Sequence, residues 1–405
     1  MLRYAVSRWP LSSSSSSIIL IPGMRKKTTS AQSVESRHRD PTFEKLMRHQ
    51  RHVTKIATIQ SLVYANPDLS LPLSFLSRLS QRLHLSRGAP SFLRKFPHVF
   101  SISSAKPLAV RFTDAADEVF RQEADTLDRS KPEAIDRLRR LLSMSASRTL
   151  PLRAIFKVWR ELGLPDDFED SVIAENPGIF ALVDNPNEPS THLLRLVETM
   201  ALPPVPAVER WRDEEYRQNR KDLEEIRFGF CHGFPPGMRL SKEFRAKTKE
   251  WQSLPYWGPY EDVGRVDFSK SRSRSRTGIK KMEKRAVGIV HEFLSLTVEK
   301  MVEVEKISQF RKWFRIDLNM RDLFLDHSGM FYLSTKGKTH TVFLREAYDR
   351  GRLIDPNPVY LARRKMLDLV MMGRRSSGCG EYDGKLESGD ESSESECEEE
   401  SAWVN

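Results

Sequence analysis

Three segments of the chain follow one pattern of apolar residues, and this repetition constrains the fold more than any local motif does. The copies cover about residues 71–120, 150–200 and 302–350. Each begins with helical spacing, continues with a short helix that ends in an aromatic residue, and closes with strand-like alternation. The aligned apolar positions are Leu76, Ile155 and Ile307; Leu83, Leu162 and Phe314; Leu85, Leu164 and Ile316; and Phe100, Phe180 and Phe331. The repetition predicts three copies of one supersecondary unit.

Each copy is predicted to be a winged-helix-like unit of two helices and a two-stranded wing. Because one such unit has a small core, the copies or the helices between them should pack together. Apolar periodicity predicts connecting helices over residues 41–66, 131–145, 206–227 and 282–300, whereas residues 228–264 are dense in Gly, Pro and aromatic residues and should be irregular. We therefore expect a mainly α protein with small β-wings, an α+β fold of three helix-helix-strand-strand repeats linked by helices.

The first 35 residues have the composition of an organellar transit peptide, which we expect to be disordered. They hold nine serines and five basic residues, and no acidic residue precedes Glu35. An amphipathic turn carrying Arg3 and Arg8 stops at Pro10, which favours the mitochondrion over the chloroplast. An ordinary disordered basic tail is the alternative interpretation.

The formal net charge of +11 conceals an acidic C-terminus. Residues 381–405 contain ten acidic residues and one lysine, so residues 1–380 carry a formal charge of +20. The acidic stretch has almost no apolar residue, and we expect residues 374–405 to form a disordered tail. The strongly basic remainder favours a polyanionic partner, and nucleic acid is the commonest such partner for a chain without membrane features.

Several classes of function lack their sequence signals. No apolar run approaches the roughly 18 residues that cross a bilayer, and the three cysteines have no zinc-binding spacing. Cys231 directly precedes His232, but adjacency alone does not pair a thiolate with its base. His291-Glu292 lacks the second His of HExxH, and neither a Walker loop nor GxGxxG is present. We expect no membrane insertion, no metal or cofactor, no small-molecule substrate and no enzymatic activity.

Eight strings between residues 71 and 348 carry a family resemblance that covers about residues 40–373. In order along the chain they are LPLSFLSRL, FLRKFPHVF, LRRLLSMSASRTLPL, LGLPDDFEDSVI, FPPG, EWQSLPYWGPYED, EKRAVGIVHEFLSLTVEK and FYLSTKGKTHTVFLREAY. Together they resemble the plant organelle RNA recognition (PORR) domain family. The resemblance implies a plant organelle protein that binds organellar intron RNA and promotes splicing of group II introns, with no enzymatic activity. The chain departs from the family pattern at Asp326-His327-Ser328, where Arg-His-Pro is expected, so one positive charge is lost.

An RNA-binding surface needs cations for phosphates and aromatic rings or Arg planes that stack on unpaired bases. The candidate phosphate contacts, near helix ends, on the wing or in an Arg/Ser insert, are Arg94, Lys95, Arg272, Arg274, Arg276, Lys284, Arg285, Lys336, Lys338 and Arg345. The candidate stacking residues are Trp251, Tyr256, Trp257 and Tyr260, for which packing of the irregular segment is the alternative. A single cation more often lies on a solvated helix face, so the total charge carries this prediction.

The sequence is compatible with three functions of different classes. The preferred one is a mitochondrial factor that binds structured intron RNA, with other splicing factors as candidate partners and the chloroplast as the alternative location. The second is an organellar DNA-binding transcription or nucleoid factor, since winged helices commonly place a helix in the major groove. The third is an assembly adaptor for organellar RNA processing that docks proteins through the acidic tail and the Arg/Ser insert at residues 270–281.

Overall fold

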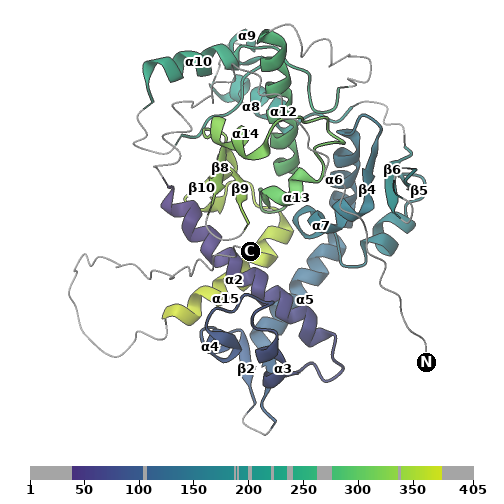
Figure 1. Ribbon diagram of the computed structural model, residues 1–405, viewed down its shortest axis with the longest axis vertical. Helices are drawn as coiled ribbons and strands as arrows, with labels where there is room; N and C mark the ends of the chain where they lie inside the picture. Colours follow the sequence, from purple (N-terminus) through teal and green to yellow (C-terminus); the bar gives the residue numbers. More distant parts are fainter. Residues whose placement is uncertain are drawn as a thin grey trace, which may run out of the picture. The chain divides into compact units, whose positions relative to one another are not determined.

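The computed structural model describes residues 39–103, 107–186, 188, 191–198, 203–219, 223–234, 240–261, 276–335 and 339–375 (Figure 1). The predicted transit peptide and the acidic sequence from residue 376 onward lie outside these residues. The chain divides into two compact units. Of the described residues, those within 39–52 and 118–365 form the large unit, and those within 53–117 and 366–375 form the small unit.

A three-stranded antiparallel sheet recurs in each copy, with the last strand in the middle. The small unit holds β1-β3-β2, formed by Leu71–Pro72, Ala109–Phe112 and Phe100–Ile102. The large unit holds β4-β6-β5, formed by Thr149–Pro151, His192–Leu196 and Phe180–Asp184, and β7-β9-β8, formed by Met301–Glu303, Thr341–Leu344 and Phe331–Ser334. The registers correspond, with Leu71 opposite Val110, Leu150 opposite Leu194 and Val302 opposite Val342.

Two short helices follow the first strand of every sheet. They are α3 (Leu73–Arg78) and α4 (Gly88–Arg94), then α7 (Leu152–Leu162) and the π-helical segment Glu169–Ala174, then α13 (Val304–Ser308) and α14 (Met320–Asp326). An α+β fold with small antiparallel sheets is thereby confirmed. The first strand of each copy, which is β1, β4 or β7, was not predicted. These strands have only two or three residues, too few to show alternation, and two of the three contain proline.

The connecting helices match the prediction in most places. The remaining elements are α2 (Pro41–Tyr64), α5 (Asp114–Arg129), α6 (Lys131–Ser143), α8 (Ala207–Asn219), α9 (Leu223–Ile226), α10 (Lys242–Gln252), α12 (Arg276–Leu296), the turn Arg345–Ala347, the pair β10 (Tyr348–Asp349) and β11 (Arg352–Leu353), and α15 (Pro358–Arg375). The expected helix at 206–227 corresponds to α8 and α9, and residues 220–222 between them lie outside the described residues. The segment 228–264 is not wholly irregular, because Ser241 Oγ accepts the Phe244 N–H at 3.1 Å and caps α10.

Helix α12 forms the interior of the large unit, where it packs against α6, α8 and β9 (Figure 1). Val287, Val290, Phe293 and Leu294 are fully buried. A helix that is buried all round must satisfy its polar side chains within the protein. The strands and helices of the second and third copies share this core, whereas those of the first copy belong to the small unit.

The small unit has an aromatic core of its own. The ring centroids of Phe92 and Phe96 lie 5.1 Å apart, and those of Phe100 and Phe112 lie 5.2 Å apart across the β2–β3 pair. All four side chains are buried. This cross-strand aromatic pair fixes the register of β2 and β3, because a slip by one residue would expose both rings.

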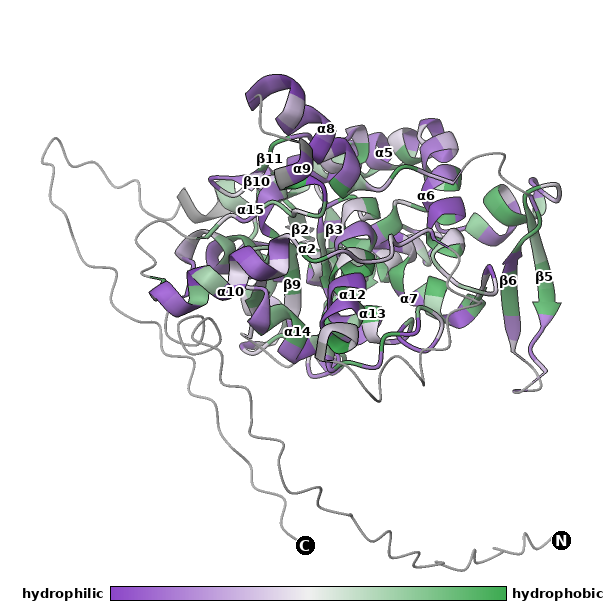
Figure 2. Cartoon of the chain, turned by 90° about the horizontal axis from the view of Figure 1, so that it is seen from above, coloured by the Kyte–Doolittle hydropathy of each residue, from purple (hydrophilic) through white to green (hydrophobic). Residues whose placement is uncertain are grey.

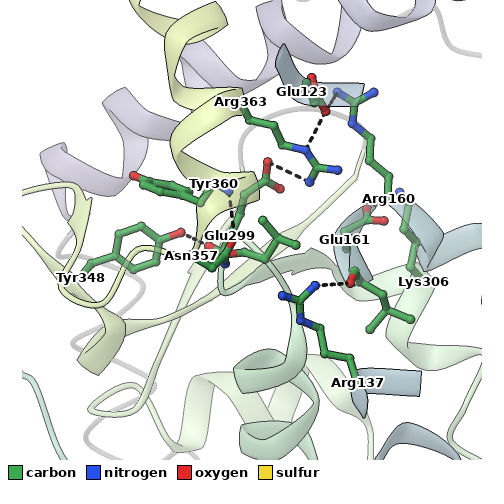
Figure 3. Close-up of polar contacts among 12 residues, drawn as sticks. Glu123, Arg137, Arg160, Glu161, Glu299, Lys306, Tyr348, Asn357, Tyr360 and Arg363 are labelled. Atoms are coloured by element: carbon green, nitrogen blue, oxygen red, sulfur yellow. Dashed lines mark hydrogen bonds and ion pairs between the residues drawn. The ribbon is translucent and has the colours of Figure 1, made fainter. Parts of the chain in front are cut away.

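Buried ion pairs connect α5, α7 and α15 within the large unit (Figure 3). Glu123 accepts from Arg363 Nε at 2.9 Å, and Arg363 Nη1 reaches Glu299 at 3.5 Å. Arg160 also approaches Glu123 at 3.5 Å. A separate pair between Lys306 and Glu161, at 2.5 Å, joins α13 of the third copy to α7 of the second. The second and third copies are therefore held together by charge as well as by apolar packing.

Hydrophilic and hydrophobic residues are distributed unevenly among the elements. Figure 2 shows that hydrophilic residues dominate α8 and α10, whereas hydrophobic residues are prominent on β5. Leu182 on β5 and Val197, which directly follows β6, are about half exposed. Among the described helices, none combines the length and the apolar character that a bilayer-spanning helix needs.

Candidate nucleic-acid interface

Residues 228–234 and 240–261 contribute to a cluster of aromatic rings and cations beside α12. Lys284 of α12 donates to the carbonyls of Trp251 and Gln252, at 2.7 and 2.8 Å. Its ammonium lies 4.7 Å from the Trp251 ring centroid and 5.5 Å from that of Tyr256. Because these carbonyls end α10, the ammonium complements the negative end of that helix. Lys284 therefore anchors the end of α10 to α12.

Burial sets the charge state of this lysine. Lys284 is fully buried, and burial, followed by the nearby Arg212 charge, lowers the pKa of its ammonium to about 7. Arg212 donates to the Gly229 carbonyl at 2.9 Å and to the Tyr256 hydroxyl at 3.1 Å. The two cations thus serve the packing of the cluster.

Arg285 and Arg345 are also interior cations. Arg285 donates to the Gly258 carbonyl at 2.5 Å, and burial lowers its pKa to about 10. Arg345 donates to the Ser328 carbonyl at 2.7 Å and lies over the Tyr332 ring, with Asp40 3.3 Å away. Phosphate contact requires an exposed guanidinium or ammonium. Lys284, Arg285 and Arg345 are buried in this structure, so none of them presents an exposed charge to a phosphate.

The aromatic candidates lie close together in the same cluster. Trp251, Tyr256 and Tyr260 pack against the core of the large unit, and Trp257 is half-buried. The Tyr260 hydroxyl donates to Glu292 at 2.6 Å, and burial together with the adjacent carboxylate raises the pKa of this tyrosine. Glu292 also accepts the Ala207 N–H at 2.6 Å. These contacts support the packing alternative for Trp251, Tyr256 and Tyr260.

The side chains of Cys231, His232 and His291 form polar interactions with other groups of the large unit. Burial lowers the pKa of His232 to about 4. The Cys231 thiol is hydrogen-bonded to Glu346, whose carboxylate pairs with His291 at 2.5 Å. The thiol therefore contacts a carboxylate and not the adjacent imidazole. Within the described ranges, no group of three His, Cys, Asp or Glu side chains is placed to hold a metal ion.

The other predicted cations fall into two groups. Arg272, Arg274, Lys336 and Lys338 lie outside the described residues, as does the side chain of Arg276 at the start of α12. Arg94 and Lys95 are exposed at the end of α4, in the small unit. The structure thus brings Lys284, Arg285 and the aromatic candidates together in the interior, while Arg94 and Lys95 lie on the surface of the other unit.

Exposed cations cover the first copy. This first-copy surface consists of Arg78, Arg82, Arg87, Arg94, Lys95 and Arg111. Arg78 ends α3, Arg82 and Arg87 lie in the following turn, and Arg111 points outward from β3 between the buried Val110 and Phe112. Arg78, Arg82 and Arg111 form no ion pair with any residue in the described part of the chain.

Charge distinguishes the three copies although their strand order is the same. Leu71–Phe112 contains seven basic residues and no acidic one. The corresponding Leu150–Leu196 contains four basic and eight acidic residues. Val302–Leu344 contains seven basic and five acidic residues. At the position five residues before the second strand, Lys95 of the first copy is matched by Glu175 and Asp326. Sequence reasoning missed Arg78, Arg82, Arg87 and Arg111, although the acid-free stretch was the available signal.

A family model described as the plant organelle RNA recognition domain matches residues 38–375. The chain belongs to this family. Protein ROOT PRIMORDIUM DEFECTIVE 1 of Arabidopsis thaliana is 38% identical over 89% of this chain and 88% of that protein. Protein WHAT'S THIS FACTOR 9, mitochondrial, of Arabidopsis thaliana is 30% identical over 84% of this chain and 87% of that protein. Protein WHAT'S THIS FACTOR 1, chloroplastic, of Zea mays is 31% identical over 91% of this chain and 75% of that protein.

The names of these PORR relatives include both plant organelles, which supports an organelle location for this chain. The PORR model covers all three copies and both compact units. No solved structure matches the chain.

Proposed function

We propose that this protein binds intron RNA in the mitochondrion and promotes the splicing of group II introns, while the RNA itself carries out the chemistry. The observation that carries the proposal is the first-copy surface, where six cations are exposed and no acidic residue interrupts them. Membership of an RNA recognition family supports RNA as the polyanion. The basic, serine-rich composition of residues 1–35 supports the mitochondrion.

The physical basis of this function is charge neutralisation. A folded intron brings many phosphates close together, and bound cations release counterions and reduce the mutual repulsion of RNA segments. Binding that favours the compact RNA over its open forms would shift the intron toward the splicing-competent fold. The protein need only discriminate between RNA conformations, so the proposal requires no catalytic side chain.

We also propose that the copies act as winged-helix-like units. The order strand, two helices, two strands, with the last strand central, supports this interpretation. In such a unit the second and third strands form the wing, and the second helix lies beside it.

Crosslinking and immunoprecipitation of the tagged protein from purified mitochondria tests this function. RNA recovered with the protein is sequenced beside an untagged control and a DNase-treated sample. Enrichment of one or a few intron-containing transcripts, together with unspliced precursors of the same transcripts after loss of the protein, is the expected result. Recovery of organellar DNA without enriched RNA would favour the transcription or nucleoid function, and RNA-independent recovery of proteins alone would favour the adaptor function.

A further inference from the structure

We propose that the first copy is the RNA-docking module of the protein, that it takes unpaired RNA strands, and that the second and third copies serve as scaffold. This inference rests on the proposed function and specifies which surface carries it and which form of RNA it binds. Its basis is a comparison of three units that share one strand order but differ in charge.

The first-copy surface offers cations on three different elements. Arg78 at the end of α3, Arg94 at the end of α4 and Arg111 on β3 are all exposed. No Asp or Glu lies between Leu71 and Phe112, so no acidic residue interrupts the stretch that holds the six exposed cations. Several phosphates can therefore be neutralised at once, which is the main source of affinity for nucleic acid.

An exposed aromatic side chain accompanies these cations. Phe75 of α3 is 36% exposed, and the Arg78 guanidinium lies 5.7 Å from its ring centroid. Unpaired bases stack on aromatic rings and on Arg planes, whereas the bases of a duplex are already stacked on one another. The Phe75–Arg78 pair therefore favours single-stranded RNA over a duplex.

The second helix of the first copy is poorly suited to reading duplex DNA. A recognition helix places the side chains of its N-terminal turns against base edges in the major groove, typically Arg, Lys, Asn or Gln. The first turn of α4 instead holds Gly88, Ala89 and Pro90, and Ala89 is fully buried. Its only basic residue, Arg94, lies at the opposite end.

The corresponding surfaces of the other copies are less favourable for RNA. In the second copy, exposed Glu175 replaces Lys95, and Arg153 is paired with Glu188 at 2.9 Å. In the third copy, Gln309 replaces Arg78 and Asp326 replaces Lys95. The same two copies share the buried core around α12, which is consistent with a scaffold role.

The repetition supplies a matched experiment on the full chain. Arg78 and Lys157 occupy equivalent positions seven residues after Leu71 and Leu150, and Arg111 and Arg195 precede the last residue of equivalent strands. All four side chains are exposed. The double variant Arg78→Gln, Arg111→Gln therefore has a matched counterpart, Lys157→Gln, Arg195→Gln, with the same loss of charge. Phe75→Leu tests stacking without a change of charge.

Fluorescence anisotropy measures binding of a labelled unstructured RNA oligonucleotide, its RNA duplex and a DNA duplex over a salt series. The first-copy double variant should lose about tenfold in affinity for the single strand, and its log–log salt slope should fall by about 1.4, at about 0.7 for each lost phosphate contact. The affinity of the second-copy double variant for the single strand should stay within about twofold of that of the unmodified protein, because the two substituted residues lie on a scaffold copy. Phe75→Leu should weaken single-strand binding about fivefold, with the salt slope unchanged.

The outcomes separate this inference from the proposed function. If the unmodified chain binds none of the three nucleic acids, the RNA-binding function itself fails. Binding of RNA with equal losses in the two double variants, or a greater loss in the second-copy variant, overturns the assignment to the first copy alone. Tighter binding of either duplex than of the single strand overturns the preference for unpaired RNA. Circular dichroism of each variant establishes that the fold is retained.

Discussion

Lys95 and Glu175 occupy the same position in two copies of one unit, five residues before the second strand of the sheet, and carry opposite charges. Phe100 and Phe180 begin those strands and face Phe112 and Leu196 in matching register. The side chains of Lys95 and Glu175 are both exposed. The two copies therefore share the same backbone position but carry opposite charges there. This difference is the basis for proposing that the first copy docks RNA and the second serves as scaffold.

Reciprocal charge changes at this position should act in opposite directions. Lys95→Glu should weaken binding of single-stranded RNA by about tenfold at low salt, and Glu175→Lys should strengthen it by about twofold to threefold, because phosphate attraction depends on local charge. Both effects should shrink as salt is added. Anisotropy titrations at two salt concentrations measure them. A gain from Glu175→Lys as large as the loss from Lys95→Glu would contradict a special role for the first copy.

Gly329 lies in the turn before β8, where even a methyl group should be too large. A Cβ there would lie 2.6 Å from both His232 Cδ2 and Phe234 Cζ. Gly329→Ala should therefore destabilise the protein by about 1–3 kcal/mol through overpacking. Gly178 is the equivalent residue of the second copy and has nothing within 4 Å of its Cβ position, so Gly178→Ala should change stability little. Urea unfolding followed by circular dichroism compares the two, and equal effects would refute the steric explanation.

Removal of Arg363 should leave Glu299 without its guanidinium partner and Glu123 with only the longer contact to Arg160, at 3.5 Å. Glu123 and Glu299 are each 13% exposed, and both pair with the guanidinium of Arg363, which is 5% exposed. Arg363→Ala should cost about 3–5 kcal/mol, as is usual when one partner of a buried pair is lost. The exposed pair of Arg121 and Glu118 provides the control, since Arg121→Ala should cost less than about 1 kcal/mol. The urea midpoints of both variants test this difference.

Lys284 should make stability depend on pH above neutrality. Its pKa of about 7 in the folded protein is below the ordinary value of 10.5. Between these values the unfolded chain binds more protons than the folded protein, so the lysine's contribution to the free energy of unfolding rises with pH. Lys284→Met lacks this contribution. The stability of the unmodified protein relative to Lys284→Met should therefore increase from about pH 7 to about pH 10, as measured by urea unfolding. Urea unfolding of Lys157→Met, which removes an exposed lysine, provides the control.

Much of the fold could be predicted because apolar periodicity survives in each copy. The helices at 41–66 and 131–145 were expected from their spacing and are found at Pro41–Tyr64 and Lys131–Ser143. The first strands of the three copies could not be predicted, because strands this short depend on a partner strand that arrives about 40 residues later in the sequence, and local pattern carries no information on that partner. Helix α10 was missed because its flanking Gly, Pro and aromatic residues obscured the Ser241 cap.

The candidate site was harder to predict than the fold. Lys284 and Arg345 were expected to face RNA, since cations usually lie on solvated surfaces. Both are instead buried over aromatic rings and bonded to backbone carbonyls. Sequence pattern does not distinguish a cation that packs on a ring from one that contacts phosphate, because both uses favour neighbouring aromatics. The absence of acidic residues from Leu71 to Phe112 was a better guide than any single lysine or arginine.

In each of the three-stranded sheets, the middle strand is the last of the three to leave the ribosome. Until it emerges, the two earlier strands have no partner within their copy and their edges are open. A transcript cut short before Ala109, His192 or Thr341 would therefore encode two unpaired edge strands in place of a finished copy. Shortened products should therefore aggregate or be degraded, because each copy can complete its sheet only after its last strand has been translated.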